Sequence, residues 1–203
     1  NAQLRCSFFY PQIKYSLFSR ILLTRFLSVN FIVKIRKVRK IMKKFIVEPE
    51  FWELFPETKI GIVLAKNIEN SMESSAEIKK NLDEANENAE QFLEAAIFSE
   101  NPVVSVWRKA YQQFKTKKGA RSSIENLLKR VDKGKAVGSI NPLVDIYNSI
   151  SLNYGLPAGG EDIDTFAGNL RLTKAVGGEH FLALGDDEAD NALPGEICYL
   201  DDE

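Results

Sequence analysis

The sequence has few residues of the kinds that build metal, redox or disulfide sites. Its 203 residues include two cysteines and a single histidine. Cys6, Cys198 and His180 together offer fewer side chains than the four ligands of a structural zinc site. The spacing of the cysteines does not suggest a disulfide framework, which favours a reducing, cytoplasmic setting. We therefore expect no metal and no other cofactor.

Long apolar runs are also missing from the first 41 residues. A transmembrane helix needs about 20 largely apolar residues, and here Arg20, Arg25 and Lys34 interrupt every run. The segment also lacks the order of regions found in a signal peptide. Two interpretations stay open: a basic membrane-surface or transit-like segment, and an upstream extension that is not part of the fold. The stretch "MKKF", which begins at Met42 and is typical of a bacterial start of translation, favours the second.

Charge is distributed unevenly along the chain. Residues 1–47 hold eleven of the 27 Lys and Arg residues and none of the 28 acidic ones, so the remainder is strongly acidic. We therefore interpret residues 1–41 as a basic leader and residues 42–203 as one domain. The family resemblance described below implies that this domain continues beyond Glu203, since the strand in "EICYLDDE" would there lead into further sheet.

The pattern of residues 42–203 predicts an α+β fold. A continuous apolar run at 59–65 predicts a buried strand. Helices are expected from a capping box of Ser74 and Glu77 as far as Ala96, after Asn101-Pro102, from Ser122 to Gly134, and from Asn141-Pro142 to Gly155. Short strands are expected in "NLRLTKA", "HFLAL" and "EICYL". Helices grouped before most strands favour α+β over a doubly wound sheet.

A basic stretch interrupts the acidic domain. Ten Lys and Arg residues lie between Arg108 and Lys135, opposed only by Glu125 and Asp132. Such a stretch is typical either of a surface that binds a phosphate backbone or of a solvated helical face, and the composition favours neither. Phosphate contacts position a partner without reading its sequence, so no DNA specificity is expected. The candidate RNA contacts are Lys115, Lys117, Lys118, Arg121 and Arg130.

The segment after the fourth expected helix combines features of a pocket built largely from backbone. Asn148 lies in that helix, and its amide can both donate and accept a hydrogen bond. Pro157 stiffens the chain, and Gly159 and Gly160 allow backbone to approach a ligand closely. A plain helix-to-strand connection would have the same residues. Neither His180 nor Cys198 lies in a pattern that favours catalysis, so we assign no catalytic residue.

These residues resemble a known family. "NPLVDIYN" (141–148) and "GLPAGGEDID" (155–164) are similar, at the same spacing, to motifs of the B-three/B-four editing domain of the bacterial phenylalanyl-tRNA synthetase beta chain. Its free-standing relatives are similar also in "WRKAY", "RSSIENLLKRV", "GGEHFLALG" and "PGEICYLDD". The resemblance covers residues 48–203 and implies an α+β fold with sheets covered by helices. It also implies a pocket that removes a wrong amino acid from charged tRNA.

The resemblance places family pocket positions on Asn148 and Pro157. Gly159 stands where the synthetase-borne domain has a histidine, and the family's acidic group for a tyrosine hydroxyl falls beyond Glu203, so tyrosine specificity is not expected to carry over. The family implies hydrolysis by a positioned water with help from a tRNA ribose hydroxyl. No aminoacylation domain is present in these residues, so we expect no complete tRNA ligase.

Three hypotheses follow from the sequence. The first is a tRNA-binding protein that hydrolyses mischarged aminoacyl-tRNA in trans, with no membrane as partner. The second is a non-catalytic RNA-binding module, which Gly159 favours. The third is a sensor that binds a small ligand in the same pocket.

Overall fold

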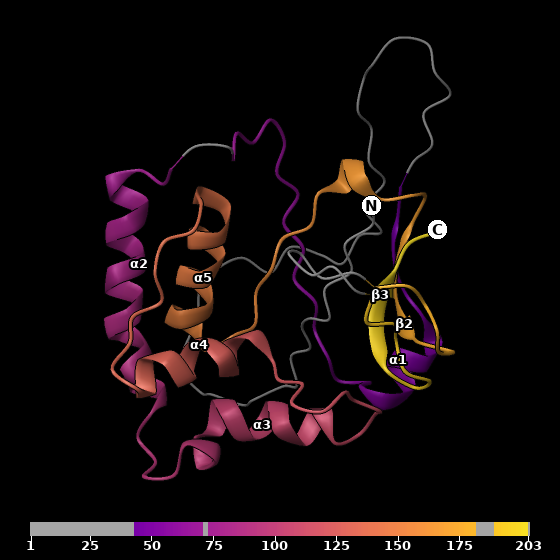
Figure 1. Cartoon of the computed structure of the whole chain (residues 1–203), viewed down its shortest axis with the longest axis horizontal. Coiled ribbons are helices and arrows are strands. Elements are labelled where there is room, and N and C mark those ends of the chain that lie inside the picture. The colour runs from indigo at the N-terminus through magenta and orange to yellow at the C-terminus, as the bar shows by residue number, and fades with distance from the viewer. Residues whose placement is uncertain (1–42, 71–72, 182–188, 203) are drawn as a thin grey trace. The chain divides into compact units, whose positions relative to one another are not determined.

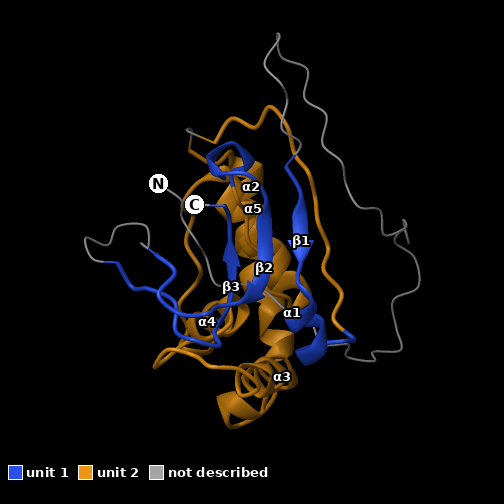
Figure 2. Ribbon diagram, turned by 90° about the vertical axis from the view of Figure 1, so that its right-hand side faces the viewer, with its two compact units in different colours: residues 1–6, 12–57, 162–203 blue, residues 7–11, 58–161 orange. Residues whose placement is uncertain are grey.

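A computed structural model describes residues 43–70, 73–181 and 189–202 (Figure 1). The chain divides into two compact units, which Figure 2 shows in different colours. In the described residues, unit 1 consists of 43–57, 162–181 and 189–202. Unit 2 consists of 58–70 and 73–161. The expected leader, residues 1–41, lies outside the described residues.

Unit 1 is built on a small mixed sheet. Its strands β1 (Phe45–Val47), β2 (Leu170–Lys174) and β3 (Ile197–Leu200) lie in the order β1-β2-β3. β1 pairs parallel with β2, with Phe45 opposite Leu170, and β3 pairs antiparallel with β2. Helix α1 (Pro49–Leu54) contacts β2. Leu172 of β2 and Phe51 of α1 are fully buried and form the centre of this unit's core.

Unit 2 is helical. It contains α2 (Ala76–Asn88), α3 (Pro102–Tyr111), α4 (Ser123–Asp132) and α5 (Pro142–Tyr154), with short 3-10 turns at Ala89–Phe92 and Phe98–Glu100. A further 3-10 turn, Ile163–Thr165, belongs to unit 1. α2 and α5 lie side by side (Figure 1). The fully buried side chains come from the apolar positions of all four helices: Leu82, Val104, Trp107, Ile124, Leu128 and Leu152.

Helices α4 and α5 begin where their capping residues predict. The Ser122 hydroxyl accepts a hydrogen bond from the Glu125 N–H at 3.3 Å, and the Asn141 side chain accepts one from the Val144 N–H at 3.0 Å. Such caps satisfy N–H groups that the first turn leaves without partners. The α+β class is confirmed, as are strands β2 and β3 and the helices that start after Ser122 and Asn141.

The capping residue expected for α2 was wrong, and the residue expected before α3 is in place but uses its side chain elsewhere. Ser75, and not Ser74, caps α2, since the Ile78 N–H donates to its hydroxyl at 3.3 Å. Ser74 is instead turned toward a buried carboxylate of α5, described below. Asn101 precedes α3 as expected, but its amide bonds the preceding loop at Ala95 N–H and Phe98 C=O. Short polar side chains can either cap a helix or bond another segment of the chain, and the available tertiary partner decides which of the two occurs.

The strand expected at 59–65 is not present. This segment is irregular, and the Val63 side chain is 93% exposed. A continuous apolar run becomes a strand only if it finds a pairing edge, and the three strands that the structure describes pair with one another. β1 was missed because three residues after two lysines are too short to form a recognisable pattern. In "HFLAL", His180 and Phe181 are not in a strand, and residues 182–184 lie outside the described residues.

The end of α5 gives a test of the packing. Gly155 closes the helix in the left-handed conformation, with φ of 63°, and a Cβ at this position would lie 3.1 Å from the Phe92 ring and from Val103 Cγ2. Gly134 has a similar φ of 65° but open space around it.

We expect Gly155→Ala to lower the free energy of unfolding by about 2–4 kcal/mol, because a left-handed alanine costs about 1–2 kcal/mol and overpacking adds more. Gly134→Ala carries the backbone cost alone and is the matched control, with an expected loss of about 1–2 kcal/mol. Denaturant unfolding of both variants measures the difference. Equal losses would contradict the close packing of Phe92 and Val103 against α5.

Candidate functional site on helix α5

The first turn of α5 is anchored by a buried carboxylate. Asp145 has no exposed surface. Its Oδ2 accepts hydrogen bonds from the hydroxyls of Ser74 and Ser139, both at 2.5 Å, and its Oδ1 accepts one from the Ile140 N–H at 2.7 Å. One side chain therefore joins α5 to the segment before α2 and to the segment before α5 itself.

These contacts keep Asp145 ionised. Burial by itself raises the pKa of this carboxyl, because it disfavours the charged form. The hydrogen bonds from the hydroxyls of Ser139 and Ser74 and from the N–H groups of Ile140 and Asn141 outweigh burial, so the pKa of Asp145 lies below its ordinary value. The carboxylate thus stabilises the fold most where it is charged.

A second amide supports the same turn from a different segment. The Leu143 N–H donates to the side-chain oxygen of Asn70 at 2.9 Å, beyond the cap that Asn141 provides. On the next turn the Ser149 hydroxyl donates to the Asp145 carbonyl at 2.7 Å. The N-terminus of α5 is therefore held by side chains from several parts of unit 2.

One turn further along α5, two buried polar side chains have no such partners. Asn148 is 8% exposed and Ser151 is fully buried. Within the part of the chain that the structure describes, the Ser151 hydroxyl has no hydrogen-bond partner, and none is found for the Asn148 carboxamide. Residues three apart lie on the same side of a helix. Fully buried side-chain atoms without a partner are, in the described residues, the hydroxyls of Ser151 and of Ser123 in α4. The amide atoms of Asn148 are not among them, so the Asn148 carboxamide keeps some exposure and can receive the polar atoms of a ligand.

The residues after α5 pass back along the helix. Gly155 reverses the chain, and the Leu156 N–H donates to the Ser151 carbonyl at 3.2 Å. A Cβ on Gly160 would lie 3.5 Å from Leu143 and 3.7 Å from Tyr147, so this glycine sits against the first half of α5.

The expected pocket residues thus share one part of unit 2. Asn148 lies on α5, Pro157 is half-buried in the returning segment, Gly159 is exposed, and Gly160 lies close to the helix. That all four line one pocket stays a prediction.

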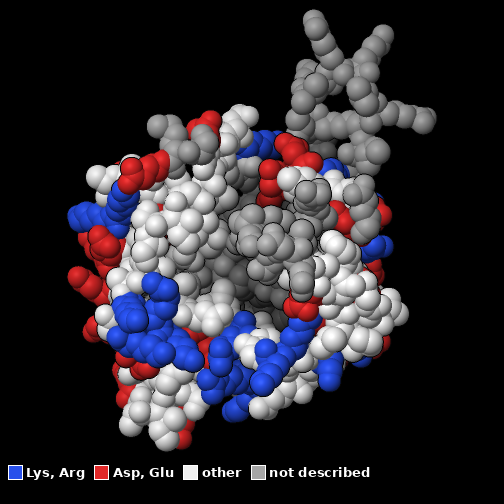
Figure 3. Space-filling model, viewed as in Figure 1, with Lys and Arg blue, Asp and Glu red and all other residues white. Residues whose placement is uncertain are grey.

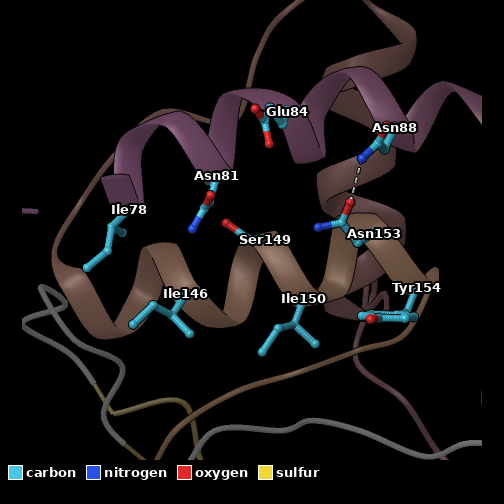
Figure 4. Close-up of a pocket in the computed structure, with 9 residues that line it drawn as sticks. All are labelled: Ile78, Asn81, Glu84, Asn88, Ile146, Ser149, Ile150, Asn153 and Tyr154. Carbon is cyan, nitrogen blue, oxygen red and sulfur yellow. Dashed lines mark hydrogen bonds between the residues drawn. The ribbon is translucent and has the colours of Figure 1, made fainter. Parts of the chain in front are cut away.

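The sequence did not predict the groove between α2 and α5. Its volume is about 310 Å³, and the Asn88 and Asn153 side chains are hydrogen-bonded across it at 2.9 Å (Figure 4). Ile146, Ile150 and Tyr154 follow one another at intervals of four along its α5 side and are 45%, 46% and 63% exposed. This spacing of apolar residues was the signal in the sequence from which an exposed apolar face of α5 could have been predicted. The remaining lining residues are Ile78, Asn81, Glu84 and Ser149.

The basic residues lie on and between α3 and α4. Figure 3 shows Lys and Arg side chains gathered over this part of unit 2. Lys115, Lys117 and Lys118 lie between the two helices, Arg121 directly precedes the cap of α4, and Arg130 lies in its last turn. Of these five, Lys117 is half-buried and the others are exposed.

Two arginines in this region share an ion pair that the sequence did not reveal. Glu125, with a side chain 2% exposed, pairs with Arg108 at 2.8 Å and with Arg121 at 3.2 Å. The sequence suggested Glu125 as one of two acidic residues within the basic stretch. The arrangement gives Arg121 a role in the fold besides its predicted contact with RNA. The hydrogen bond from Arg108 to Glu125 raises the pKa of the arginine despite partial burial.

Residues of unit 1 that carry reactive groups have ordinary surroundings. Cys198 is a buried free thiol in β3, as expected. Glu179 accepts hydrogen bonds from the N–H groups of Val176 and Gly177 at 2.7 and 2.9 Å. Burial raises the pKa of this carboxyl. Hydrogen bonds from its own N–H and from those two neighbours lower the pKa by more than burial raises it, so the pKa lies below its ordinary value. Glu179 thus stabilises a turn, and His180 beside it is exposed.

Two kinds of feature are absent from the described residues. No helix among them is long and apolar enough to cross a membrane. No group of three or more His, Cys, Asp or Glu residues in the described ranges could hold a metal ion.

The fold and site define an α+β protein with a polar helix face and a basic surface over neighbouring helices. A family model described as the B3/4 domain matches residues 106–203, from within α3 to the end of the sequence. Residues 106–203 are therefore similar to the B3/4 domain, whereas the particular similarity to the phenylalanyl-tRNA synthetase editing domain stays a prediction. Neither a comparison with curated proteins nor one with solved structures found a match.

The Asp145 anchor predicts a pH dependence. A lowered pKa in the folded state stabilises the protein above the unfolded value of about 3.9, and this stabilisation is lost as the pH falls through the folded pKa. We expect Asp145→Asn to cost about 2–3 kcal/mol near neutral pH, because charged hydrogen bonds are lost from a buried site. The difference from the unchanged protein should shrink below about pH 4.

Denaturant unfolding between pH 3 and 7 measures this difference. The control is Asp132→Asn, a change at an exposed carboxylate in the last turn of α4, with an expected effect within about 0.5 kcal/mol. A cost for Asp145→Asn that does not change with pH would show that the charge of Asp145 is not what stabilises the turn.

Proposed function

We propose that this protein binds the aminoacylated 3′ end of tRNA and hydrolyses the ester of mischarged aminoacyl-tRNA in trans. The observation that carries the proposal is Asn148, a residue 8% exposed whose carboxamide has no partner among the described residues, in the "NPLVDIYN" motif of the segment similar to a B3/4 domain. Such domains occur in phenylalanyl-tRNA synthetase beta chains, which supports a role connected with tRNA.

The reaction suits a site without a nucleophile. Water attacks the carbonyl carbon of the ester, the bond to the ribose oxygen breaks, and the products are the free amino acid and a tRNA with its terminal hydroxyl restored. The ester is already activated, so positioning of the water and stabilisation of the developing oxyanion supply most of the acceleration. A ribose hydroxyl beside the ester can assist the proton transfer.

The chain's own groups have distinct tasks in this proposal. The Asn148 carboxamide, which can donate and accept, orients the polar atoms of the aminoacyl ester. Gly159 and Gly160 let backbone N–H groups approach the carbonyl oxygen, since no side chain stands between. Pro157 stiffens the segment that presents them. The shape of the pocket then selects which side chains enter, as a second sieve after aminoacylation.

The basic residues of α3, α4 and the segment between them provide the electrostatic part. Lys115, Lys117, Lys118, Arg121 and Arg130 contact tRNA phosphates and so position the acceptor end. Binding that depends on phosphate contacts weakens as the salt concentration rises, because the release of counterions from the RNA then contributes less free energy.

A second candidate is a non-catalytic RNA-binding module. Gly159, in place of the family's histidine, favours it, because one polar contact to the substrate is missing. A sensor for a small ligand in the same pocket is the further alternative from the sequence.

Deacylation of a panel of mischarged tRNAs tests the proposal. We expect selective release from one or a few pairs, reduced about tenfold or more in Asn148→Ala, since one lost hydrogen bond to the transition state is worth at least 1.4 kcal/mol. The free energy of unfolding should change little, because the Asn148 carboxamide has no protein partner to lose.

The matched control is Asn153→Ala. It removes an amide of the same helix that lines the groove between α2 and α5 and pairs with Asn88. It should leave deacylation unchanged. Binding of tRNA without release from any pair would favour the RNA-binding module. Release that survives in Asn148→Ala would exclude Asn148 from the site.

A further inference from the structure

We propose that Arg108 and Arg121, held side by side by the buried carboxylate of Glu125, form a clamp for one phosphate group of an RNA backbone. The choice of RNA as the source of the phosphate rests on the proposed function. The clamp itself rests on the geometry of the three side chains.

One oxygen atom organises both arginines. Glu125 Oε1 accepts hydrogen bonds from Arg108 Nη2 at 2.8 Å and from Arg108 Nε at 3.2 Å, and it pairs with Arg121 Nε at 3.2 Å. Arg108 comes from α3, and Arg121 directly precedes the N-terminal cap of α4. Because both bond to the same atom, the two guanidinium groups lie next to each other although the residues are 13 positions apart in sequence.

Both guanidinium groups keep donors for a ligand. Each carries five N–H donors in a planar fork. The carboxylate occupies Nε and Nη2 of Arg108, which leaves Nη1, and it pairs with Nε of Arg121, which leaves both Nη groups. The side chains are 42% and 39% exposed, whereas that of Glu125 is 2% exposed. The carboxylate is therefore inside and the unused edges of the two forks face solvent.

The charges of this cluster do not cancel. Two guanidinium groups around one carboxylate leave one positive charge, and a single arginine bonded through two nitrogens would already pair with Glu125. Arginine forks match the geometry of phosphate oxygens and bind them bidentately. A second arginine held beside the first thus suits an anion with several oxygens better than it suits folding alone.

The clamp differs from the lysines nearby in how it is held. Lys118 is exposed in the segment between α3 and α4, where its flexible ammonium group attracts phosphate as a point charge. Arg108 and Arg121 are fixed before a ligand arrives, so less side-chain entropy is lost on binding. Glu125 acts here as a positioning residue, since it holds the arginines and does not touch the phosphate.

Glu125→Gln separates the clamp from a simple effect of net charge. The substitution removes a negative charge, so general electrostatic attraction predicts tighter binding of tRNA. The clamp predicts the opposite, because a neutral amide no longer holds two guanidinium groups. We expect the Kd for tRNA, measured at a fixed salt concentration, to rise about fivefold or more.

Arg108→Lys and Arg121→Lys provide a second test that keeps the charge and removes the fork. Each should raise the Kd for tRNA about tenfold, the loss of one bidentate contact. The control for attraction by charge alone is Lys66→Arg, which also keeps the charge but changes an exposed side chain outside the basic stretch, and it should leave the Kd nearly unchanged. Circular dichroism of each variant establishes that it is folded.

Two results would overturn the clamp while leaving tRNA binding intact: tighter binding by Glu125→Gln, or affinities of both Arg→Lys variants equal to that of the unchanged protein. If the unchanged protein binds no tRNA, the proposed function fails, and titration with inorganic phosphate decides the clamp separately. Saturable shifts of the Arg108 and Arg121 Nε–H resonances, absent in Glu125→Gln, would support it. Their absence in the unchanged protein would overturn it.

Discussion

The candidate site depends on one buried charge, the carboxylate of Asp145. A carboxylate without exposed surface is costly unless its oxygens are hydrogen-bonded. This requirement is met by the hydroxyls of Ser74 and Ser139 and by the Ile140 N–H. All three groups lie outside α5, in the segments before α2 and before α5. The constraint fixes where α5 starts and how it is rotated about its axis. It thereby sets the direction of Asn148, less than one turn further on.

Along α5, satisfied and unsatisfied polar groups alternate with position. Asp145 and Ser149 have partners, whereas Asn148 and Ser151 have none among the described residues. The same contrast occurs in the basic region, where Glu125 is bonded by two arginines whose outer edges are open. In both places a buried acid fixes the position of groups that are left with capacity to bind. The proposed ester site and the proposed phosphate clamp thus share one physical design.

The sequence predicted the features that depend on local rules. The caps at Ser122 and Asn141 and the short strand β2 are set by residues close in sequence. What it could not predict depends on distant partners. Val63 is exposed because no strand pairs with its segment, and Ser74 serves Asp145 and not α2. The shared bond of Arg108 and Arg121 to Glu125 requires α3 and α4 to meet, which no pattern within either helix shows.

The central claim is that Asn148 receives the polar atoms of an aminoacylated 3′ end. The most direct test is to follow the side-chain amide resonances of Asn148 while adding amide-linked 3′-aminoacylamino-adenosines, which resemble the substrate but resist hydrolysis. The account predicts a saturable shift of the Asn148 amide with one or a few aminoacyl groups and no comparable shift of Asn153. An Asn148 amide that does not respond to any of these compounds, or responds no more than Asn153, would contradict it.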